Sequence, residues 1–392
     1  MRRLDTRVVH AGKDDLVALG VHAPPIDRST TYPLASLALG TQDIDALAAG
    51  GRPTSSSVYA RLHNPTVARW ESAIASLEGA DEAVAFGSGM AAVTAALLAA
   101  GAAGRHVVAL RPLYGGTDHL LSSGMFGTRT TWTTADKVAA AIEDDTALVV
   151  METPSNPTLA LVDIADVVAQ AGAVPVLVDN TFATPILQRP LEHGATWALH
   201  SATKALGGHG DVMAGVVACG AGHAPVLRQV RVGTGAVLDP QAAYLLHRSL
   251  STLALRVRAA QANATELAQR LHDHPKVVEV HHPSLPDDDP HGLVGQQMDG
   301  PGGILAFEPA GGLPVAARVM ESVELITPAV SLGSAETLIE HPAGLTHRIV
   351  GSEERASGGI TPGLLRVSAG IEDVEDLWED LSRAIATADA QG

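Results

Sequence analysis

Lys204 has an unusual setting for a lysine. It follows the apolar run WALHS (197–201), with the hydroxyl residues Ser201 and Thr203 before it and the glycine-rich segment ALGGHGD (205–211) after it. Shielding from water favours the neutral, nucleophilic form of an amine, which is the form that attacks a carbonyl group to make an imine. The pattern therefore suits an imine-forming lysine, with an ordinary loop lysine as the alternative.

A carboxylate stands at a similar place in an earlier segment. Asp179 ends the apolar run VPVLVD (174–179). A buried carboxylate needs a partner, and a protonated pyridine nitrogen is one such partner, because the carboxylate keeps that nitrogen charged. An aspartate that caps a helix or is satisfied inside the core is the alternative.

A glycine-containing turn offers backbone groups that suit a phosphate. The segment AVAFGSGMAAVTAALL (83–98) runs from an apolar stretch through Gly89 and Met90 into a helical pattern. Exposed N–H groups at a helix start favour a phosphate. The turn does not extend to GxGxxG, and GxxxxGK[ST] does not occur, which disfavours dinucleotides and nucleoside triphosphates.

Two of the four tyrosines lie in polar loops instead of apolar runs. Tyr114, in RPLYGGTDHL (111–120), follows the run HVVAL (106–110), and its flat ring can stack on a heterocycle. Tyr59 stands two residues before Arg61. A phenol hydroxyl and a guanidinium together can bind a phosphate.

Six short apolar runs alternate with helical segments between about residues 60 and 250. They are AVAF (83–86), HVVAL (106–110), TALVVME (146–152), VPVLVD (174–179), WALHS (197–201) and GVVAC (215–219). Runs that are apolar on both faces and alternate with helices predict an α/β fold, a mainly parallel sheet covered by helices. Polar functional groups collect beyond the carboxyl ends of such strands, where Tyr114, Asp179 and Lys204 stand.

We expect three parts in the chain. Residues 1–58 lack sustained periodicity, which predicts an extended arm with one short helix (37–49) that contacts a neighbouring subunit or its own domain. Residues 59–245 would form the α/β domain, and residues 246–392 a smaller α+β domain. One long helix with a 3.6-residue period is expected from about 241 to 272.

The composition excludes several classes of protein. With 26 Lys and Arg against 43 Asp and Glu, the net charge is −17, which disfavours nucleic acids and anionic membranes as partners. The single cysteine, Cys219, rules out an internal disulfide and a Cys-rich zinc site, and the histidines lack metal-binding spacing, so we expect no metal. The N-terminal sequence MRRLDTRVVHAG has no apolar signal segment, which favours the cytoplasm.

Taken together and in order, these motifs resemble one enzyme family. The segments YAR (59–61), GSGM, YGGT, ETPSNP, VDNTF, SATK with GGHGD, SLG and LLRVSAGIED are similar to the cystathionine γ-synthase/γ-lyase family of pyridoxal 5′-phosphate (PLP) enzymes, also called the Cys/Met metabolism family. The resemblance starts at VVHAG (8–12) and covers essentially the whole chain. It implies fold type I of PLP enzymes, which is aspartate-aminotransferase-like, and a homo-oligomer that is at least a dimer and usually a tetramer.

The resemblance also implies a role for each candidate residue. Lys204 would hold the cofactor covalently and then move protons. Asp179 would pair with the pyridine nitrogen, and Tyr114 would stack on the ring and assist the leaving group. The groups that would bind the phosphate are Gly89, Met90, Ser201, Thr203 and, from a neighbouring subunit, Tyr59 and Arg61.

At the substrate, Arg366 would bind the α-carboxylate with help from Asn156 and Ser331. The segment 329–347 resembles γ-lyases, methionine γ-lyases in particular, more than synthases. It favours γ-elimination of L-methionine or L-cystathionine to 2-oxobutyrate, ammonia and a thiol. γ-Replacement on O-acyl-homoserine is one alternative, and a non-catalytic regulatory protein is a second.

Some positions depart from the pattern of methionine γ-lyases. Gly116 stands where those enzymes typically carry a cysteine, and residues 232–237 lack their Lys-Asp pair. Glu336 would either select a distal amino group, such as that of cystathionine, or be a charged loop residue. These departures concern the side-chain end of the substrate pocket and leave the cofactor residues unchanged.

Overall fold

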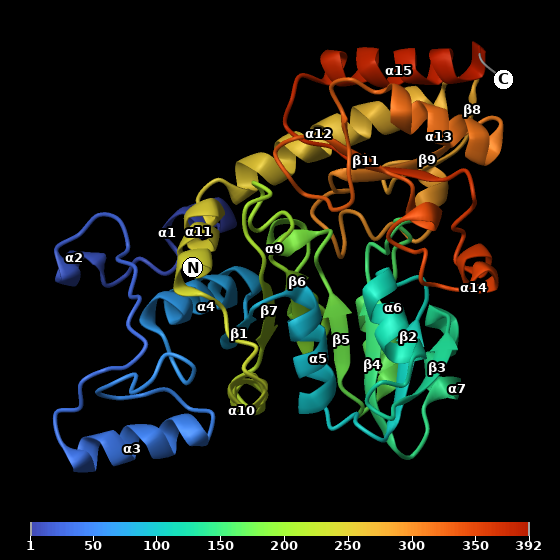
Figure 1. Ribbon diagram of the computed structural model, residues 1–392. Helices are drawn as coiled ribbons and strands as arrows, with labels where there is room; N and C mark the ends of the chain where they lie inside the picture. The colour runs from blue at the N-terminus through green and yellow to red at the C-terminus, as the bar shows by residue number, and fades with distance from the viewer. Residues whose placement is uncertain (1, 391–392) are drawn as a thin grey trace.

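Two β-sheets organise the chain. The computed structural model describes residues 2–390 and contains a seven-stranded sheet with the order β1-β7-β6-β5-β4-β2-β3 and a five-stranded sheet with the order β10-β11-β12-β9-β8. Figure 1 shows the larger sheet in the lower half of the molecule and the smaller sheet above it. The carboxyl ends of the parallel strands of the larger sheet point toward the smaller one.

The larger sheet is mainly parallel, as the alternating apolar runs predict. Its strands are β1 (Glu82–Phe86), β2 (His106–Leu110), β3 (Arg129–Thr133), β4 (Thr146–Glu152), β5 (Val176–Asp179), β6 (Trp197–Ser201) and β7 (Gly215–Cys219). Strands β3, β2, β4, β5 and β6 are parallel, while β7 pairs antiparallel with both β6 and β1. Strand β1 therefore runs in the same direction as β6. Edge strand β3 was not expected, because its sequence RTTWT is polar.

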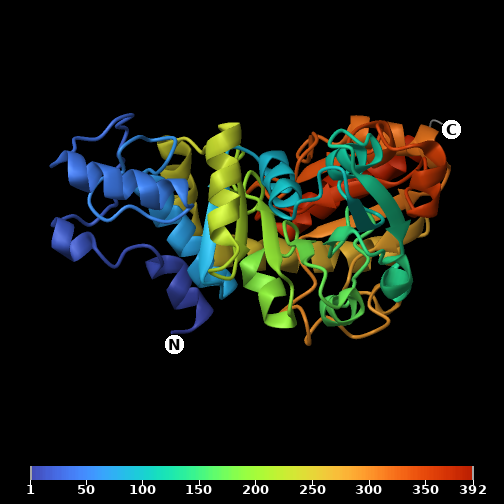
Figure 2. The same cartoon turned by 90° about the horizontal axis from the view of Figure 1, so that it is seen from below.

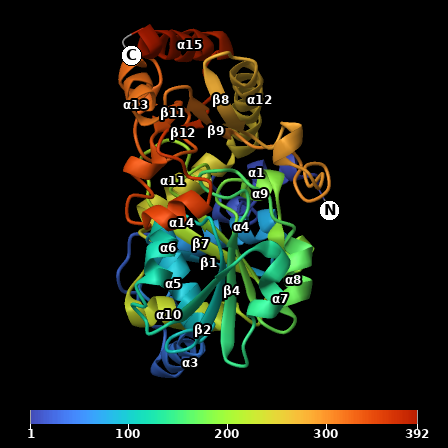
Figure 3. The ribbon, with the colours of Figure 1, turned by 90° about the vertical axis from the view of Figure 1, so that its right-hand side faces the viewer.

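Helices cover both faces of this sheet, which explains why its strands are apolar on both sides. On one face lie α5 (Gly89–Ala99), α6 (Gly115–Ser122) and α10 (Ala224–Thr234). On the other lie α4 (Pro65–Glu78), α7 (Val138–Ala141), α8 (Ile164–Ala171), α9 (Thr184–Leu187) and α11 (Pro240–Leu250). Figure 3 shows α5, α6 and α10 on one side and α7 and α8 on the other.

Local signals fix where the helices next to the carboxyl edge begin. Helix α4 starts with Pro65 after Asn64, whose side chain accepts hydrogen bonds from the N–H groups of the first turn. Helix α5 starts after Ser88, whose hydroxyl accepts from the N–H of Ala91. The turn before α5 is thereby held at the end of β1.

The smaller sheet packs against three helices. Its strands are β8 (Val277–His281), β9 (Ile304–Pro309), β10 (Thr327–Pro328), β11 (Leu338–Glu340) and β12 (Leu365–Ser368). Helices α12 (Leu253–His272), α13 (Gly312–Ser322) and α15 (Val374–Ala390) share an apolar core with them, and α14 (Ser352–Ser357) lies outside it. Single 3₁₀ turns are η1 (Ala135–Lys137), η2 (Pro190–His193), η3 (Pro286–Asp288) and η4 (Pro342–Gly344).

The prediction of one long helix from 241 to 272 is wrong. The segment forms two helices, α11 and α12, with residues 251–252 between them. The carbonyl oxygen of Ser249 accepts hydrogen bonds from Arg256 Nη2 at 3.0 Å and from Thr252 Oγ1 at 3.3 Å, so side chains use an acceptor that would otherwise serve the helical ladder. Apolar spacing continues on both sides of the break, and the pattern did not reveal it.

The first N-terminal helix, α1 (Leu4–His10), packs on α4 with Val8 in the apolar core, and the residues after it form an extension. Helices α2 (Leu16–Leu19) and α3 (Leu37–Ala48) lie on this extension, and α3 corresponds to the expected short helix. Figure 2 shows the part with α2 and α3 projecting away from both sheets. The division of the chain at residues 58 and 245 stays a prediction. Within residues 2–390, no helix is long and apolar enough to cross a membrane.

Candidate active site

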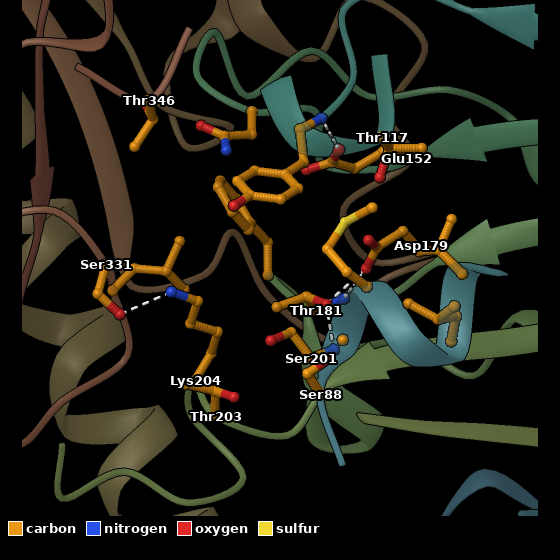
Figure 4. A pocket seen from close by; sticks show the side chains of 18 of the residues that line it. Ser88, Thr117, Glu152, Asp179, Thr181, Ser201, Thr203, Lys204, Ser331 and Thr346 are labelled. Atoms are coloured by element: carbon orange, nitrogen blue, oxygen red, sulfur yellow. Dashed lines mark hydrogen bonds between the residues drawn. The ribbon is translucent and has the colours of Figure 1, made fainter. Parts of the chain in front are cut away.

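A pocket of about 380 Å³ lies at the edge of the larger sheet where the parallel strands end. Its opposite wall comes from the C-terminal part of the chain, through the loop at Ser331 and strand β12. The candidate residues Gly89, Met90, Tyr114, Asn156, Asp179, Ser201, Thr203, Lys204, Ser331 and Arg366 all line the pocket. Figure 4 shows side chains from both walls facing this space.

Lys204 lies in the turn that follows β6. Its backbone N–H donates to Ser201 O at 3.1 Å and its carbonyl accepts from the N–H of Gly208 at 2.8 Å, so the turn is closed around it. The amine Nζ donates to Ser331 Oγ at 2.6 Å, across the pocket wall (Figure 4). Burial lowers the pKa of Lys204 to about 8, helped by the positive charge of Arg366 and opposed by Glu340. The neutral amine is therefore accessible near neutral pH.

Asp179 ends β5 on the other side of the pocket from Lys204 (Figure 4). Its Oδ1 accepts hydrogen bonds from Thr181 N at 3.0 Å and Thr181 Oγ1 at 2.5 Å. Thr181 Oγ1 in turn accepts from Ser201 N at 2.8 Å, which ties the ends of β5 and β6 together. Burial raises the pKa of Asp179, while the Thr181 hydrogen bonds and nearby His200 act in the opposite direction.

The start of α5 and the end of β6 form a narrow concave corner. A Cβ atom on Gly89 would lie 2.9 Å from Ser201 Cβ and Oγ, so only glycine lets the two segments come this close. Thr203 is held nearby, because its hydroxyl accepts from Ala214 N at 3.0 Å. Unpaired N–H groups at the helix start and these hydroxyls make a corner suited to an anion.

Tyr114 precedes the first turn of α6 and lines the pocket with a side chain that is 39% exposed. Its backbone N–H donates to Glu152 Oε2 at 2.6 Å. A Cβ atom on Gly116 would lie 2.6 Å from Tyr114 Cε1, which shows that the ring packs directly over this glycine. The ring position therefore depends on the residue type at position 116.

Arg366, on β12, is 2% exposed and is held on three sides. Its Nη1 contacts Asn156 Oδ1 and Glu340 Oε1, each at 2.8 Å, and its Nη2 donates to Ser331 O at 2.6 Å. Ser331 has a φ of 93°, a region that non-glycine residues rarely adopt and that costs on the order of 1–3 kcal/mol. The structure therefore joins the three expected substrate residues in one cluster.

Three residues singled out in the sequence lie outside the pocket wall. Tyr59 is 45% exposed, and Arg61 Nη1 donates to Val232 O at 3.1 Å. Their expected role involves a second copy of the chain, so it stays a prediction. Glu336 is exposed and does not line the pocket, which favours the loop-residue interpretation of this position.

Two buried acidic residues of the site were not expected. Glu152 is the last residue of β4 and lines the pocket next to Asp179, with which it pairs in register. It ends an apolar run just as Asp179 does, so the strand-end rule could have found it. Glu340 ends the short strand β11, whose sequence carries no comparable signal, and its contact with Arg366 depends on long-range folding.

Comparisons with known proteins agree with this geometry. Residues 5–386 match the family model of the Cys/Met metabolism PLP-dependent enzymes. An L-methionine gamma-lyase of Brevibacterium sandarakinum is 55% identical over 384 residues, covering 97% of each chain. Another of Streptomyces avermitilis is 54% identical over 389 residues, covering 99% of this chain and 90% of the relative.

Solved structures extend the likeness to three dimensions. A methionine gamma lyase from Micromonospora echinospora superposes with a TM-score of 0.85 at 40% identity, covering 98% of this chain and 99% of the other. A cystathionine gamma-lyase from Lactobacillus plantarum, complexed with L-serine, gives a TM-score of 0.91 at 33% identity, covering 99% and 100%. This chain therefore belongs to the Cys/Met metabolism family of PLP-dependent enzymes and has their type I fold.

Proposed function

We propose that this enzyme is a γ-lyase that converts L-methionine and water into methanethiol, 2-oxobutyrate and ammonia. The observation that carries the proposal is the content of one pocket: a lysine amine with a lowered pKa, a carboxylate on the opposite side and a buried guanidinium. The identity of 54–55% to L-methionine gamma-lyases supports the same reaction.

The residues of the pocket fit PLP. The corner at Gly89 and Met90, with the hydroxyls of Ser201 and Thr203, would take the phosphate. Asp179 would face the ring nitrogen, since its Oδ1 is fixed by Thr181 and the carboxylate lines the cavity. When bound, PLP draws electrons from the α-carbon of the amino acid through its protonated ring, which makes neighbouring protons removable.

Lys204 would both hold the cofactor and move protons. Its pKa of about 8 leaves a fraction of neutral amine at neutral pH, so the side chain can accept a proton from a substrate carbon and return it. Its hydrogen bond to Ser331 Oγ keeps the amine next to the substrate-binding wall. Tyr114, on the same pocket, would donate a proton to the leaving sulfur.

Arg366 would bind the α-carboxylate of the substrate. A guanidinium has five N–H groups. Hydrogen bonds to Asn156 Oδ1 and Ser331 O use two of them, and Nη1 also forms an ion pair with Glu340. One N–H of Nη2 and the N–H of Nε remain, and Nε has no hydrogen-bond partner among the described residues. Two adjacent N–H groups suit a carboxylate.

The outer part of the pocket favours methionine over cystathionine. Met213 and Val330 are 64% and 52% exposed and line the cavity together with the Tyr114 ring. Cystathionine carries a second ammonium and carboxylate, and charged groups without partners bind poorly in such a place. The charged side chains that line the pocket, within the part of the chain the structure describes, are Glu152, Asp179, Lys204 and Arg366, and none is free for a distal amino group.

Elimination from cystathionine and γ-replacement on O-acyl-homoserine remain the alternative reactions, since both use the same cofactor residues. A non-catalytic regulatory role is disfavoured, because a binding protein has no need for Lys204, Asp179, Tyr114 and Arg366 in one pocket. Solved structures of cystathionine gamma synthase from Xanthomonas oryzae share the fold with TM-scores of 0.91. The fold alone therefore does not separate these reactions.

We propose that the active unit is a dimer at least, within a tetramer. Residues 1–58 would reach a neighbouring subunit, where Tyr59 and Arg61 would meet the phosphate of the cofactor. Strong exposure of apolar side chains on this arm supports such an interface, with Val17 at 92% and Leu37 at 85%. In this arrangement residues 59–245 form the cofactor domain and residues 246–392 the C-terminal domain.

We also propose a cytoplasmic enzyme without a nucleic-acid or membrane partner. The net charge of −17 supports the second point. The buried free thiol of Cys219 is compatible with a reducing compartment.

Product analysis tests the reaction. The purified protein, reconstituted with PLP, is incubated with L-methionine, with L-cystathionine, or with O-acyl-homoserine plus cysteine. We expect equal amounts of 2-oxobutyrate and methanethiol from methionine at a higher kcat/KM than from cystathionine. Formation of cystathionine in the third mixture, without turnover of methionine, would establish the replacement reaction instead.

A further inference from the structure

Glu152 is a buried carboxyl group of the pocket for which the proposed mechanism has no use. It is 4% exposed and ends β4 at the carboxyl edge of the sheet. Its Oε2 accepts the backbone N–H of Tyr114 at 2.6 Å, and Figure 4 marks a hydrogen bond at Glu152 with a dashed line. The carboxyl group therefore holds the start of α6, and with it the tyrosine expected to act on the leaving group.

A second carboxyl group stands beside it. Glu152 and Asp179 are register partners on the parallel strands β4 and β5. Glu152 is buried and Asp179 is partly buried, and two neighbouring carboxyl groups shielded from water do not both ionise readily, because like charges repel strongly there. One of the two will hold a proton unless cations compensate both.

The surrounding groups decide which one is ionised. Burial raises the pKa of Asp179, but two hydrogen bonds from Thr181 act against this and favour its charged form, and nearby His200 acts in the same direction. Glu152 is faced by Asp179 and, among cations, by Arg366, which already forms an ion pair with Glu340.

At Glu152 the surrounding groups favour the neutral form. Burial and the charge of Asp179 raise the pKa of Glu152 well above its usual value, against the N–H groups of Tyr114 and Asn156 and the charge of Arg366. A neutral carboxyl group keeps one oxygen as an acceptor for the Tyr114 N–H. The two demands on this residue, neutrality and an acceptor, are therefore compatible.

We propose that Glu152 is a positioning residue for Tyr114 that stays protonated, so that Asp179 alone supplies the negative charge next to the cofactor ring. The assignment of roles to Tyr114 and Asp179 rests on the proposed function. The hydrogen bond, the register pair and the burial of Glu152 are properties of this chain itself.

Three variants of the holoenzyme test the neutral state. Glu152→Gln removes the ionisable proton and any negative charge but keeps an acceptor oxygen, while Glu152→Ala removes the acceptor as well. The control Asp179→Asn removes a charge. The readouts are the dissociation constant of PLP and the pH midpoint of its visible absorption. We expect Asp179→Asn to weaken PLP binding by about tenfold or more and to shift the midpoint, since one pKa unit corresponds to about tenfold in an equilibrium. Glu152→Gln should do neither.

Turnover tests the positioning role. We expect Glu152→Ala to lower kcat/KM for methionine by about 10- to 100-fold, because a displacement of about 1 Å in a reacting group can cost about 100-fold. Glu152→Gln should restore most of this loss. In a Tyr114→Phe background, which lacks the hydroxyl, the Glu152→Ala loss should shrink to less than about threefold, since residues that act through one another are not additive.

Several results would overturn the inference. A PLP affinity or pH midpoint that moves in Glu152→Gln as it does in Asp179→Asn would show that Glu152 is ionised. A Glu152→Ala loss that is equally large with and without the Tyr114 hydroxyl would show a general structural role. A wild-type holoenzyme that binds PLP without turning over methionine would refute the proposed reaction, and the PLP readouts would still decide the state of Glu152.

Discussion

Replacing Arg366 by methionine tests the proposed carboxylate site. The substitution keeps an unbranched side chain in the same space but removes the two N–H groups left for a substrate. Charge-assisted hydrogen bonds are worth about 1.5–3 kcal/mol each. Losing two of them at the lower value costs about 3 kcal/mol, which at about 1.4 kcal/mol per tenfold is roughly a 150-fold fall in kcat/KM. We expect most of this as a rise in KM, because the carboxylate is bound before and during the reaction.

The same substitution also breaks a buried ion pair. Arg366 and Glu340 are 2% and 0% exposed at 2.8 Å, and removing one partner of such a pair costs about 3–5 kcal/mol of folding free energy. Burial already raises the pKa of Glu340, so this residue can take up a proton and reduce the cost. The matched control is Arg231→Met, because Arg231 pairs with Glu71 at 2.6 Å in a similarly buried setting and lies outside the pocket wall.

Both variants are compared by urea unfolding, by the visible absorption of bound PLP and by methionine kinetics. We expect both to unfold at lower urea concentration and both to keep the cofactor, while only Arg366→Met raises KM. An equal KM in the two variants would refute the carboxylate role of Arg366. If Arg366→Met does not fold, Arg366→Lys keeps the charge without the planar fork and should raise KM about tenfold.

Two further predictions concern the cofactor. Lys204 has a pKa of about 8 and only its neutral form reacts, so the rate at which apoenzyme takes up PLP should rise about tenfold per pH unit below pH 8 and level off above it. If stopped-flow absorption shows a rate that still rises beyond about pH 9, the lowered pKa of Lys204 is wrong. Gly89→Ala places a Cβ atom 2.9 Å from Ser201 and should weaken PLP binding about tenfold or more, since overpacking costs about 1–3 kcal/mol. The control Gly222→Ala meets no atom within 4 Å and should leave the dissociation constant of PLP unchanged; equal constants in both variants would remove Gly89 from the phosphate site.

Much of the sheet could be predicted because burial on both faces leaves a strong sequence signal. All six apolar runs are strands, and the rule that polar groups gather beyond strand ends brought Tyr114, Asp179 and Lys204 to one pocket. Edge strand β3 has polar residues and gave no such signal. The break between α11 and α12 was missed because it depends on hydrogen bonds from Arg256 and Thr252, not on apolar spacing.

The acidic residues Glu152 and Glu340 of the site could not be predicted from the sequence patterns used. Glu152 ends an apolar run but was not predicted, because the proposed role of a neutral carboxyl group depends on its neighbours Asp179 and Tyr114. Glu340 meets Arg366 only through pairing of β11 with β12, in which these two residues are register partners. Contacts of this kind arise from the smaller sheet, whose short strands carry weak patterns.

The most direct test of the proposed role of Lys204 is to identify the residue to which PLP is attached. Holoenzyme is treated with borohydride to fix the cofactor on its lysine, digested, and analysed by peptide mass spectrometry. Lys204, in the turn after β6, is expected to carry the added pyridoxyl phosphate mass, and a Lys204→Ala preparation should show no stable label. Labelling of Lys13, Lys137 or Lys276 in its place, or unlabelled wild-type protein, would contradict the proposal that Lys204 holds PLP covalently.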